Sequence, residues 1–213
     1  MPAGLDVIDK ESFMNRIAAA ALAAVLAAPT LALAAPWALD AAHSKAGFKV
    51  RHMMVSWTEG QFKTVDAKID YDEKKPQNLK IEATIDVASV DTNNDKRDEH
   101  LRSADFFDVA NHPKMTFKST KVKVNKDGSL KVTGDLTMRG VTKSVVLDVE
   151  KPGVGTNPWG QQVFGTTATT KLNRKDFGLV WNQGLETGGL LVGEDVHVTL
   201  NLEFNPVQAQ AGK

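Results

Sequence analysis

Five histidines are the side chains best able to bind a metal or move a proton, and their spacing matches no metal motif. They are His43, His52, His100, His112 and His197. None belongs to an HExxH sequence or to another pairing typical of zinc ligands. His43 and His52 could meet a third ligand in the folded protein, but the sequence offers no support for one. We therefore predict neither a metal centre nor a bound cofactor.

The run Asp91-Thr92-Asn93-Asn94-Asp95 matches the first five positions of a calcium-binding loop. Lys96 then occupies the position that needs glycine, and Arg102 stands where a bidentate glutamate is required. The same residues suit the start of a helix, because an asparagine at position 93 or 94 would cap a short helix over residues 95–102. We predict a capped helix here and not a calcium site.

The helix would carry Arg97, Asp98, Glu99 and His100, which put two carboxylates and an imidazole in one turn. Consecutive helix residues point in different directions, so these groups do not converge on a substrate. We interpret Asp98 and Arg102 as a surface ion pair at i, i+4, and Arg97 as an anchor that donates hydrogen bonds to nearby carbonyls. The serines lack a G-x-S-x-G motif, so we predict no catalytic residue.

Alternation of apolar and polar residues at period two predicts strands with one buried face over most of the remaining chain. A phase change across Ser119 to Lys121 predicts a β-bulge, and Asp127-Gly128 and Arg139-Gly140 predict turns. Eight long antiparallel strands can close into a barrel that holds side chains or one small ligand. A two-sheet sandwich is the alternative. The expected strands cover residues 46–54, 65–71, 79–87, 115–124, 130–138, 141–149, 164–172 and 196–204.

His52 continues the inward-facing series that contains Phe48 and Val50, and Met54 would follow it. An unpaired polar group among apolar ones costs about 1–3 kcal/mol, so His52 needs a partner. The partner is either protein or water, as for an ordinary core histidine, or the head group of a ligand. Large aromatic residues beside small ones on the inward faces would leave a channel, although the same residues could simply fill the barrel.

Two connections are longer than a turn. In residues 92–113, Leu101 and the pair Phe106-Phe107 would seat the short helix on the barrel as a cover. Residues 173–193 are rich in glycine and of mixed polarity, which indicates a structured loop or a cover over one barrel end.

The N-terminal region is typical of a secretory signal peptide. Arg16 precedes an apolar run from Ile17, and Ala32-Leu33-Ala34 forms a small-residue cleavage site. A membrane anchor is the alternative, but Pro29-Thr30 interrupts the run and no basic stop-transfer patch follows. We expect residues 1–34 to be the signal peptide, with translation starting at Met1 or Met14. The domain would cover residues 35–206, followed by a frayed tail over residues 207–213.

Composition narrows the class of partner. Cleavage after Ala34 removes two basic and three acidic residues from the 26 of each kind, leaving a formal net charge of +1. A near-neutral protein without a basic stripe is a poor candidate for nucleic acid, whose binding depends on neutralised phosphates. The absence of cysteine excludes a disulfide framework. We expect a periplasmic protein that binds no nucleic acid.

Four segments of the chain carry a family resemblance. They are FKVRH at 48–52, SVDTNNDKRDEHLRSADFFDVANHPKMTFKST at 89–120, GDLTMRGVTKSVVLDV at 134–149 and NRKDFGLVWN at 173–182. Together they resemble the YceI-like, polyisoprenoid-binding periplasmic proteins, from about Ala38 to Phe204. The resemblance implies an all-β fold, a lipocalin-like extended eight-stranded antiparallel β-barrel with a short helical cover. It also implies an apolar tunnel for an isoprenoid chain, as in isoprenoid quinones, or for another long amphiphile, with no metal.

On this resemblance we expect an exported carrier or storage protein with homodimer formation and transient membrane contact. An extracytoplasmic stress or interaction module and an isoprenoid-modifying enzyme that uses His52 are the alternatives. Met53, Met54 and Trp57 are bulkier than the residues that many relatives have at these positions. The resemblance therefore does not determine the width of one tunnel end. The predicted ligand contacts are Phe48, Val50, His52, Met54, Trp57, Phe62, Phe106, Phe107, Phe117, Leu136, Met138, Phe164, Phe177, Leu179 and Trp181.

Overall fold

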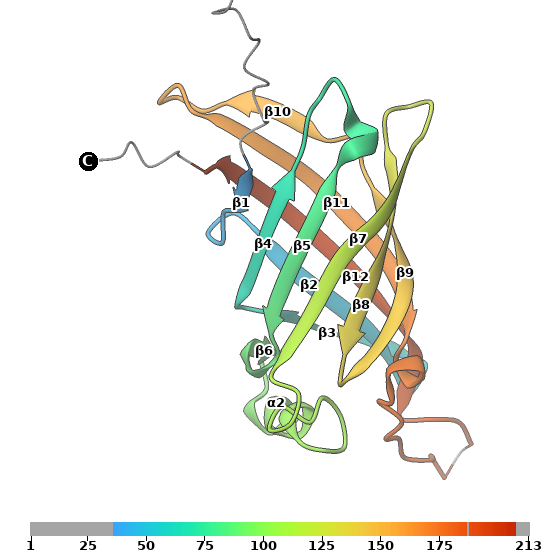
Figure 1. Ribbon diagram of the computed structural model, residues 1–213. Coiled ribbons are helices and arrows are strands. Elements are labelled where there is room, and N and C mark those ends of the chain that lie inside the picture. The colour runs from blue at the N-terminus through green and yellow to red at the C-terminus, as the bar shows by residue number, and fades with distance from the viewer. Residues whose placement is uncertain (1–35, 187, 208–213) are drawn as a thin grey trace, which may run out of the picture. The chain divides into compact units, whose positions relative to one another are not determined.

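The computed structural model describes residues 36–186 and 188–207, which form a closed β-barrel with short helical segments at its ends (Figure 1). The expected signal peptide, residues 1–34, and all of the expected tail except Val207 lie outside the described residues. The strands are β1 (Trp37–Leu39), β2 (Lys45–His52), β3 (Ser56–Phe62), β4 (Val65–Asp70), β5 (Lys80–Asp86), β6 (Val90–Asp91), β7 (Lys114–Val124), β8 (Leu130–Met138), β9 (Val141–Val149), β10 (Gly153–Thr156), β11 (Gln162–Asn173) and β12 (Val192–Pro206). The helical segments are η1 (Pro76–Asn78), η2 (Val87–Ser89), α2 (Asp95–Arg102) and η3 (Arg174–Phe177).

The last strand closes the sheet. One edge of β12 pairs with β11 from Asp195 to Phe204, and its other edge pairs first with β2 and then with β1. The ring runs β11, β9, β8, β7, β5, β4, β1 and β12, with every pairing antiparallel. The predicted eight-stranded antiparallel barrel is therefore confirmed, and the sandwich alternative is excluded.

Local signals in the sequence predicted several features correctly. The register of β7 against β8 shifts between Ser119 and Lys121, where a bulge was expected. Asn94 caps α2 through its side chain, which accepts a hydrogen bond from the Arg97 amide at 3.0 Å. Arg139 and Gly140 both have positive φ, 50° and 73°, as the tight turn between β8 and β9 requires.

The first predicted strand, residues 46–54, extends two residues beyond the observed end of the strand. β2 ends at His52, and the chain turns at Met53 and Met54, whose φ values are 48° and 62°. It then returns as β3, which pairs with β2 from Ser56 to Phe62. The turn contains no asparagine or glycine, the residues that normally announce left-handed backbone.

The segment of η2, β6 and α2 lies at the lower end of the barrel, beside the connection between β3 and β4 (Figure 1). The Lys63 amide donates to the Ser89 carbonyl at 3.1 Å, and the Val87 amide donates to the Pro113 carbonyl at 3.0 Å. Arg102 adds two hydrogen bonds to the carbonyls of Ala88 and Val90, at 2.9 and 3.0 Å. No helix in the described part of the chain is long and apolar enough to cross a membrane.

The predicted ion pair between Asp98 and Arg102 is wrong. Asp98 is buried and accepts hydrogen bonds from the amide and hydroxyl of Thr92, while Arg102 bonds the backbone of η2 and β6. Both side chains satisfy polar groups of the connecting loop, which the sequence spacing could not reveal. Arg97 is the predicted anchor, because its guanidinium donates to the Thr92 carbonyl at 2.7 Å.

The β1–β2 connection is fixed by the carboxylate of Asp40. It accepts hydrogen bonds from the Ala42 amide at 2.9 Å, from the His43 ring at 3.1 Å and from the Asn205 side chain at 2.9 Å. The hydrogen bond from His43 lowers the pKa of Asp40 and raises the pKa of His43, with Glu203 contributing to the second shift. The connection is therefore held most tightly when Asp40 is ionised and His43 is protonated.

We predict that His43 makes stability depend on pH near neutrality. A raised pKa in the folded state means that the protonated ring stabilises the fold fully below pH 6.5, and that this contribution is lost as pH rises through the raised pKa. The Tm advantage of the wild type over His43→Asn should shrink between pH 5.5 and pH 8.5. Parallel Tm curves for the two proteins would contradict the assignment.

Candidate ligand-binding cavity

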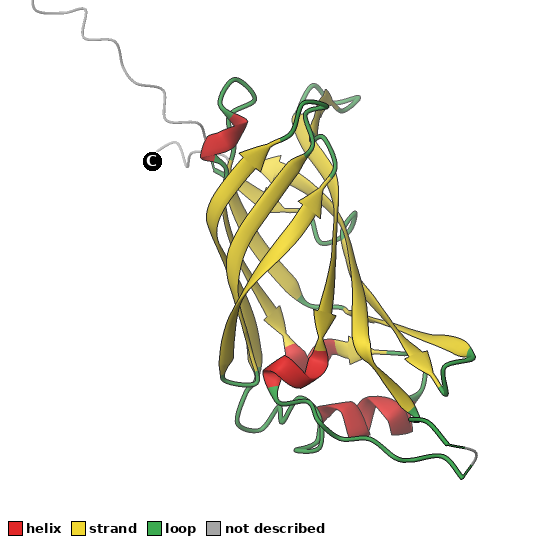
Figure 2. Cartoon of the chain, turned by 90° about the vertical axis from the view of Figure 1, so that its right-hand side faces the viewer, coloured by secondary structure: helices red, strands yellow, loops and turns green. Residues whose placement is uncertain are grey.

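The barrel encloses a cavity of about 260 Å³ that is lined almost entirely by carbon atoms. A cavity needs only about 10–15 Å³ of such space to hold one water molecule, so this cavity is far larger than a packing void. Its walls come from inward-facing side chains of β2, β4, β5, β7, β8, β9, β11 and β12. Figure 2 shows the barrel from the side, with α2 at its lower end and η1 at its upper end.

Ten of the fifteen predicted contact residues line this cavity. They come from the strands, from the loop that follows α2 and, for Leu179, from the loop that follows η3, so the short helical cover contributes to the wall. The ten are Phe48, Val50, Phe62, Phe106, Phe107, Phe117, Leu136, Met138, Phe164 and Leu179.

Met54 and Trp57 do not face the interior, and that prediction is wrong. Met54 is 60% exposed, because the turn after His52 reverses the chain before the alternation reaches it. Trp57 lies on the outer face of β3, with the Arg51 guanidinium carbon 4.2 Å from the centre of its ring. His52 is half-buried at the end of β2 and is not part of the cavity wall.

Phe177 and Trp181 lie behind the wall at the lower end. Phe177 is buried, and Trp181 packs against Phe106 with 5.2 Å between ring centres. His100 of α2 meets Trp181 at 4.7 Å, edge to face. These residues hold the cover in place and do not touch the cavity, so their predicted ligand contact is not supported by their position.

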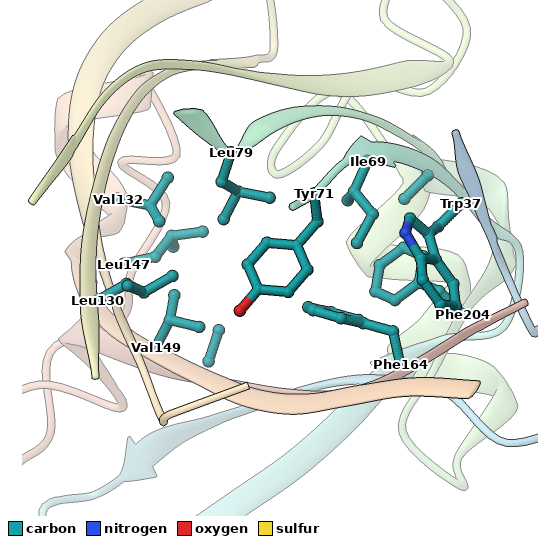
Figure 3. Close-up of a cluster of buried hydrophobic side chains, with 12 residues drawn as sticks. Trp37, Ile69, Tyr71, Leu79, Leu130, Val132, Leu147, Val149, Phe164 and Phe204 are labelled. Carbon is teal, nitrogen blue, oxygen red and sulfur yellow. The ribbon is translucent and has the colours of Figure 1, made fainter. Parts of the chain in front are cut away.

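The upper end of the barrel is closed by an aromatic plug of Trp37, Tyr71, Phe164 and Phe204. The Tyr71 and Phe164 rings are 4.8 Å apart, and Phe164 also meets Trp37 at 5.9 Å and Phe204 at 5.6 Å. Figure 3 shows the Tyr71 ring in the middle of the barrel cross-section, among Leu130, Val149 and their neighbours. Burial raises the pKa of Tyr71. The cavity therefore ends at the plug.

Two glycines give the aromatic rings of the wall their position. A Cβ atom on Gly60 would lie 2.5 Å from the Phe48 Cζ atom, and one on Gly134 would lie 2.3 Å from the Phe117 Cζ atom. Each ring thus rests directly on the backbone of a neighbouring strand. The space along the barrel axis stays open because the rings occupy the room that side chains would have taken.

Among the described residues that line the cavity, Arg174 is the one with a charged side chain, and it was not among the predicted contacts. Its side chain is 4% exposed and donates to the carbonyls of Gly193 at 2.9 Å and Trp181 at 2.8 Å, with further bonds to Leu179 and Val192. Burial lowers the pKa of the guanidinium. Arg174 continues the inward series of Thr170 and Leu172, so the alternation of β11 was the signal that could have revealed it.

Arg174 acts as a clasp between the lower loop and the start of β12. Its donors point at backbone carbonyls, so the face that it turns to the cavity is mainly hydrocarbon. A ligand in the cavity consequently meets almost no polar atom. This arrangement suits an apolar chain and offers no acid or base to a reaction.

Titratable groups outside the cavity form surface ion pairs. Within the described residues, the one His/Asp/Glu group compact enough for a metal ion is Asp40, His43 and Glu203. His43 donates to Asp40 there, and its ring nitrogen is 3.7 Å from a Glu203 oxygen, as in a surface ion pair. Asp91, the first residue of the calcium-loop match, pairs with Lys63 at 2.8 Å.

Residues 37–204 match the model of the YceI-like domain family. The chain belongs to the YceI-like family. Its curated relatives carry the name UPF0312: one from Staphylococcus epidermidis is 42% identical over 78% of this chain and 95% of its own length. Another, from Ectopseudomonas mendocina, is 43% identical over 72% of this chain and 81% of its own length.

Solved YceI-like structures share the barrel. The YceI protein of Campylobacter jejuni is 33% identical, with a TM-score of 0.64 over 75% of this chain and 91% of its own. BcnA of Burkholderia cenocepacia is 27% identical, with a TM-score of 0.66 over 78% and 98%. A polyisoprenoid binding domain of Saccharophagus degradans, 18% identical, has the same fold with a TM-score of 0.58 over 82% and 99%.

We predict that Arg174→Met destabilises the barrel by about 3 kcal/mol, because it leaves buried carbonyls without donors. Urea denaturation of this variant should show the loss, and Arg174→Lys should recover only part of it, since one ammonium cannot reach carbonyls on both sides. Lys175→Met is the control, because Lys175 lies on the same turn and makes a surface ion pair with Glu194. Equal effects at positions 174 and 175 would refute the clasp.

Proposed function

We propose that this YceI-like protein holds the chain of a long isoprenoid-type lipid in the barrel cavity and acts as an exported carrier or storage protein. The supporting observation is the composition of the cavity wall. Aliphatic and aromatic side chains surround the axis, and the guanidinium of Arg174 donates its hydrogen bonds to backbone carbonyls. The ligand class is a polyisoprenoid, an isoprenoid quinone or a similar amphiphile. The S. degradans domain, which is named for polyisoprenoid binding, supports this class.

Energetics favour such a ligand over a small polar one. Burial of one CH2 group contributes about 0.8 kcal/mol, so ten buried groups contribute about 8 kcal/mol. That free energy corresponds to a Kd of about 1 μM before the cost of ordering the chain is subtracted. Tight binding thus needs a long hydrocarbon portion. The wall has no polar partner for a head group, so the head group stays at or beyond the lower end of the cavity.

A catalytic role has less support. An isoprenoid-modifying enzyme needs a titratable group beside the ligand, and the candidate His52 lies outside the wall. Among the described lining residues, the titratable side chain is that of Arg174, which remains protonated in proteins. We therefore propose a binding protein that removes the chain from water and releases it unchanged. Export to the periplasm rests on the sequence of residues 14–35.

The ligand itself is the first test. We expect native mass spectrometry of the protein, purified without detergent, to show a bound amphiphile at one per barrel. Organic extraction would then identify its class. A protein that is empty, and that also fails to take up added isoprenoid quinone, would contradict the proposal.

Filling the cavity should abolish binding. Ala168 is buried in the wall, and Ala168→Trp would place an indole on the axis, so quinone uptake should fall by more than tenfold. Thr169→Trp is the control, because Thr169 is exposed on the outer face of the same strand. The Tm of each variant verifies folding.

Substitutions that fill the cavity also distinguish a lipid carrier from the alternative, a stress or interaction module in which the barrel is only a scaffold. If cells that produce Ala168→Trp together with Ala83→Trp keep the wild-type phenotype, the barrel serves as a stress or interaction module and the cavity is not its working part. If the protein is a carrier, cells that produce the double variant should have the same phenotype as cells that lack the protein.

A further inference from the structure

The turn between β2 and β3 is strained as well as exposed. Met53 and Met54 are both in the left-handed region, with φ values of 48° and 62°, and Val55 closes the turn with an amide hydrogen bond to the His52 carbonyl at 3.1 Å. Glycine and asparagine adopt this backbone easily, whereas two consecutive methionines adopt it at a cost. Strain of this kind persists mostly where a side chain is needed for function.

The side chains held there are large and apolar. Met53 is 40% exposed, Met54 60% and Val55 75%, and Trp57 is 37% exposed beside them. We call residues 53–57 the hairpin tip. The Met53 amide bonds the Leu191 carbonyl at 2.8 Å, which joins the tip to a loop where Val180 and Leu190 are also exposed. Contiguous apolar surface of this kind marks an interaction site, while single exposed residues do not.

Cations flank the tip. The Lys49 Nζ atom lies 5.0 Å and the Arg51 guanidinium carbon 4.2 Å from the centre of the Trp57 ring. Neither cation makes a salt bridge within the described residues, although Glu59 is the cross-strand neighbour of Lys49. Tryptophan with lysine and arginine is the combination that anchors proteins at the boundary between acyl chains and head groups.

The tip lies at the lower end of the cavity, opposite the aromatic plug. Val50, at the end of β2, and Val192, which pairs with His52, both line the cavity wall. The aromatic plug closes the opposite end. In Figure 1, β2 runs down to the same end as η3, where Arg174 fastens the loop. A surface that the tip enters would therefore face the end of the barrel that has no aromatic plug, where the helical cover and the loop fastened by Arg174 lie.

We propose that the hairpin tip docks this protein on an anionic phospholipid bilayer. The methionines and Val55 enter the acyl boundary, Trp57 lies at the head groups, and Lys49 and Arg51 meet the lipid phosphates. A projecting turn of flexible side chains inserts into a fluid bilayer, whereas a protein partner would need a matching hollow. The inference rests on the proposed function for its purpose, because it names the surface from which the barrel takes its lipid.

The test is partitioning of the mature chain, from which the expected signal peptide of residues 1–34 has been removed, onto vesicles of phosphatidylethanolamine with 30% phosphatidylglycerol, measured by flotation. Without the apolar run of residues 17–34, differences between the variants report the tip. Met53→Asn with Met54→Gly relieves the strained turn and removes both methionines. We expect this variant to have a higher Tm than the wild type and at least a tenfold lower partition coefficient. Lys49→Gln with Arg51→Gln should remove most of the dependence on phosphatidylglycerol and on salt.

The matched control is Trp159→Ser. Trp159 is 82% exposed, but it lies at the β10–β11 hairpin, far from the tip along the barrel, and its removal should leave partitioning unchanged. Equal partitioning of the wild type and the Met53→Asn, Met54→Gly variant would overturn the proposal. So would concentration-dependent self-association that this variant abolishes, because the tip would then join two copies of the chain.

Uptake of quinone from dilute detergent separates the docking proposal from the proposed function. The tip variant should bind quinone from detergent as the wild type does, because its cavity wall is intact. A wild-type protein that does not bind quinone would refute the proposed carrier function, whatever the result with vesicles. Normal quinone binding with unchanged vesicle partitioning would refute the docking surface alone.

Discussion

The use of both edges of β12 is the constraint on which the rest of the structure depends. Its 15 residues bond β11 along one edge, and β2 and then β1 along the other. Because β11 and β1 are also joined to each other through β9, β8, β7, β5 and β4, pairing of both β12 edges closes the sheet into a ring. The inward side chains then have only each other, or a ligand, to pack against. Cavity, plug and cover all follow from that closure.

The sequence predicted the barrel because the signals for it are local or periodic. Alternation at period two repeats along each strand, so the inward positions of Phe48, Phe117 and Phe164 follow without knowledge of their neighbours. The cap of α2 and the bulge in β7 likewise depend on a few adjacent residues. Ten of the predicted contacts line the cavity for this reason.

The remaining contacts depended on features that a single stretch of sequence does not encode. Met54 and Trp57 were placed inside because a turn without glycine or asparagine looks like continuing strand. Asp98 was expected at the surface, although Thr92 buries it through two hydrogen bonds from the preceding loop. The alternation of β11 indicates that Arg174 faces inward, but its partners, the carbonyls of residues 179–193, come together only in the fold. The errors at Asp98 and Arg174 concern contacts between segments, whereas the error at Met54 and Trp57 concerns the end of β2 and the turn into β3.

The rings seated on Gly60 and Gly134 have a consequence for how the ligand preference of such a barrel can change. Beside Gly60 and Gly134, the width of the cavity is set by the backbone and one phenyl ring, because no other side chain lies between them. A single substitution on either glycine narrows the cavity, and a single substitution on either phenylalanine widens it. The strand pairing is carried by backbone hydrogen bonds and does not depend on these side chains. Selectivity for chain girth can therefore drift among YceI-like proteins while the architecture stays fixed.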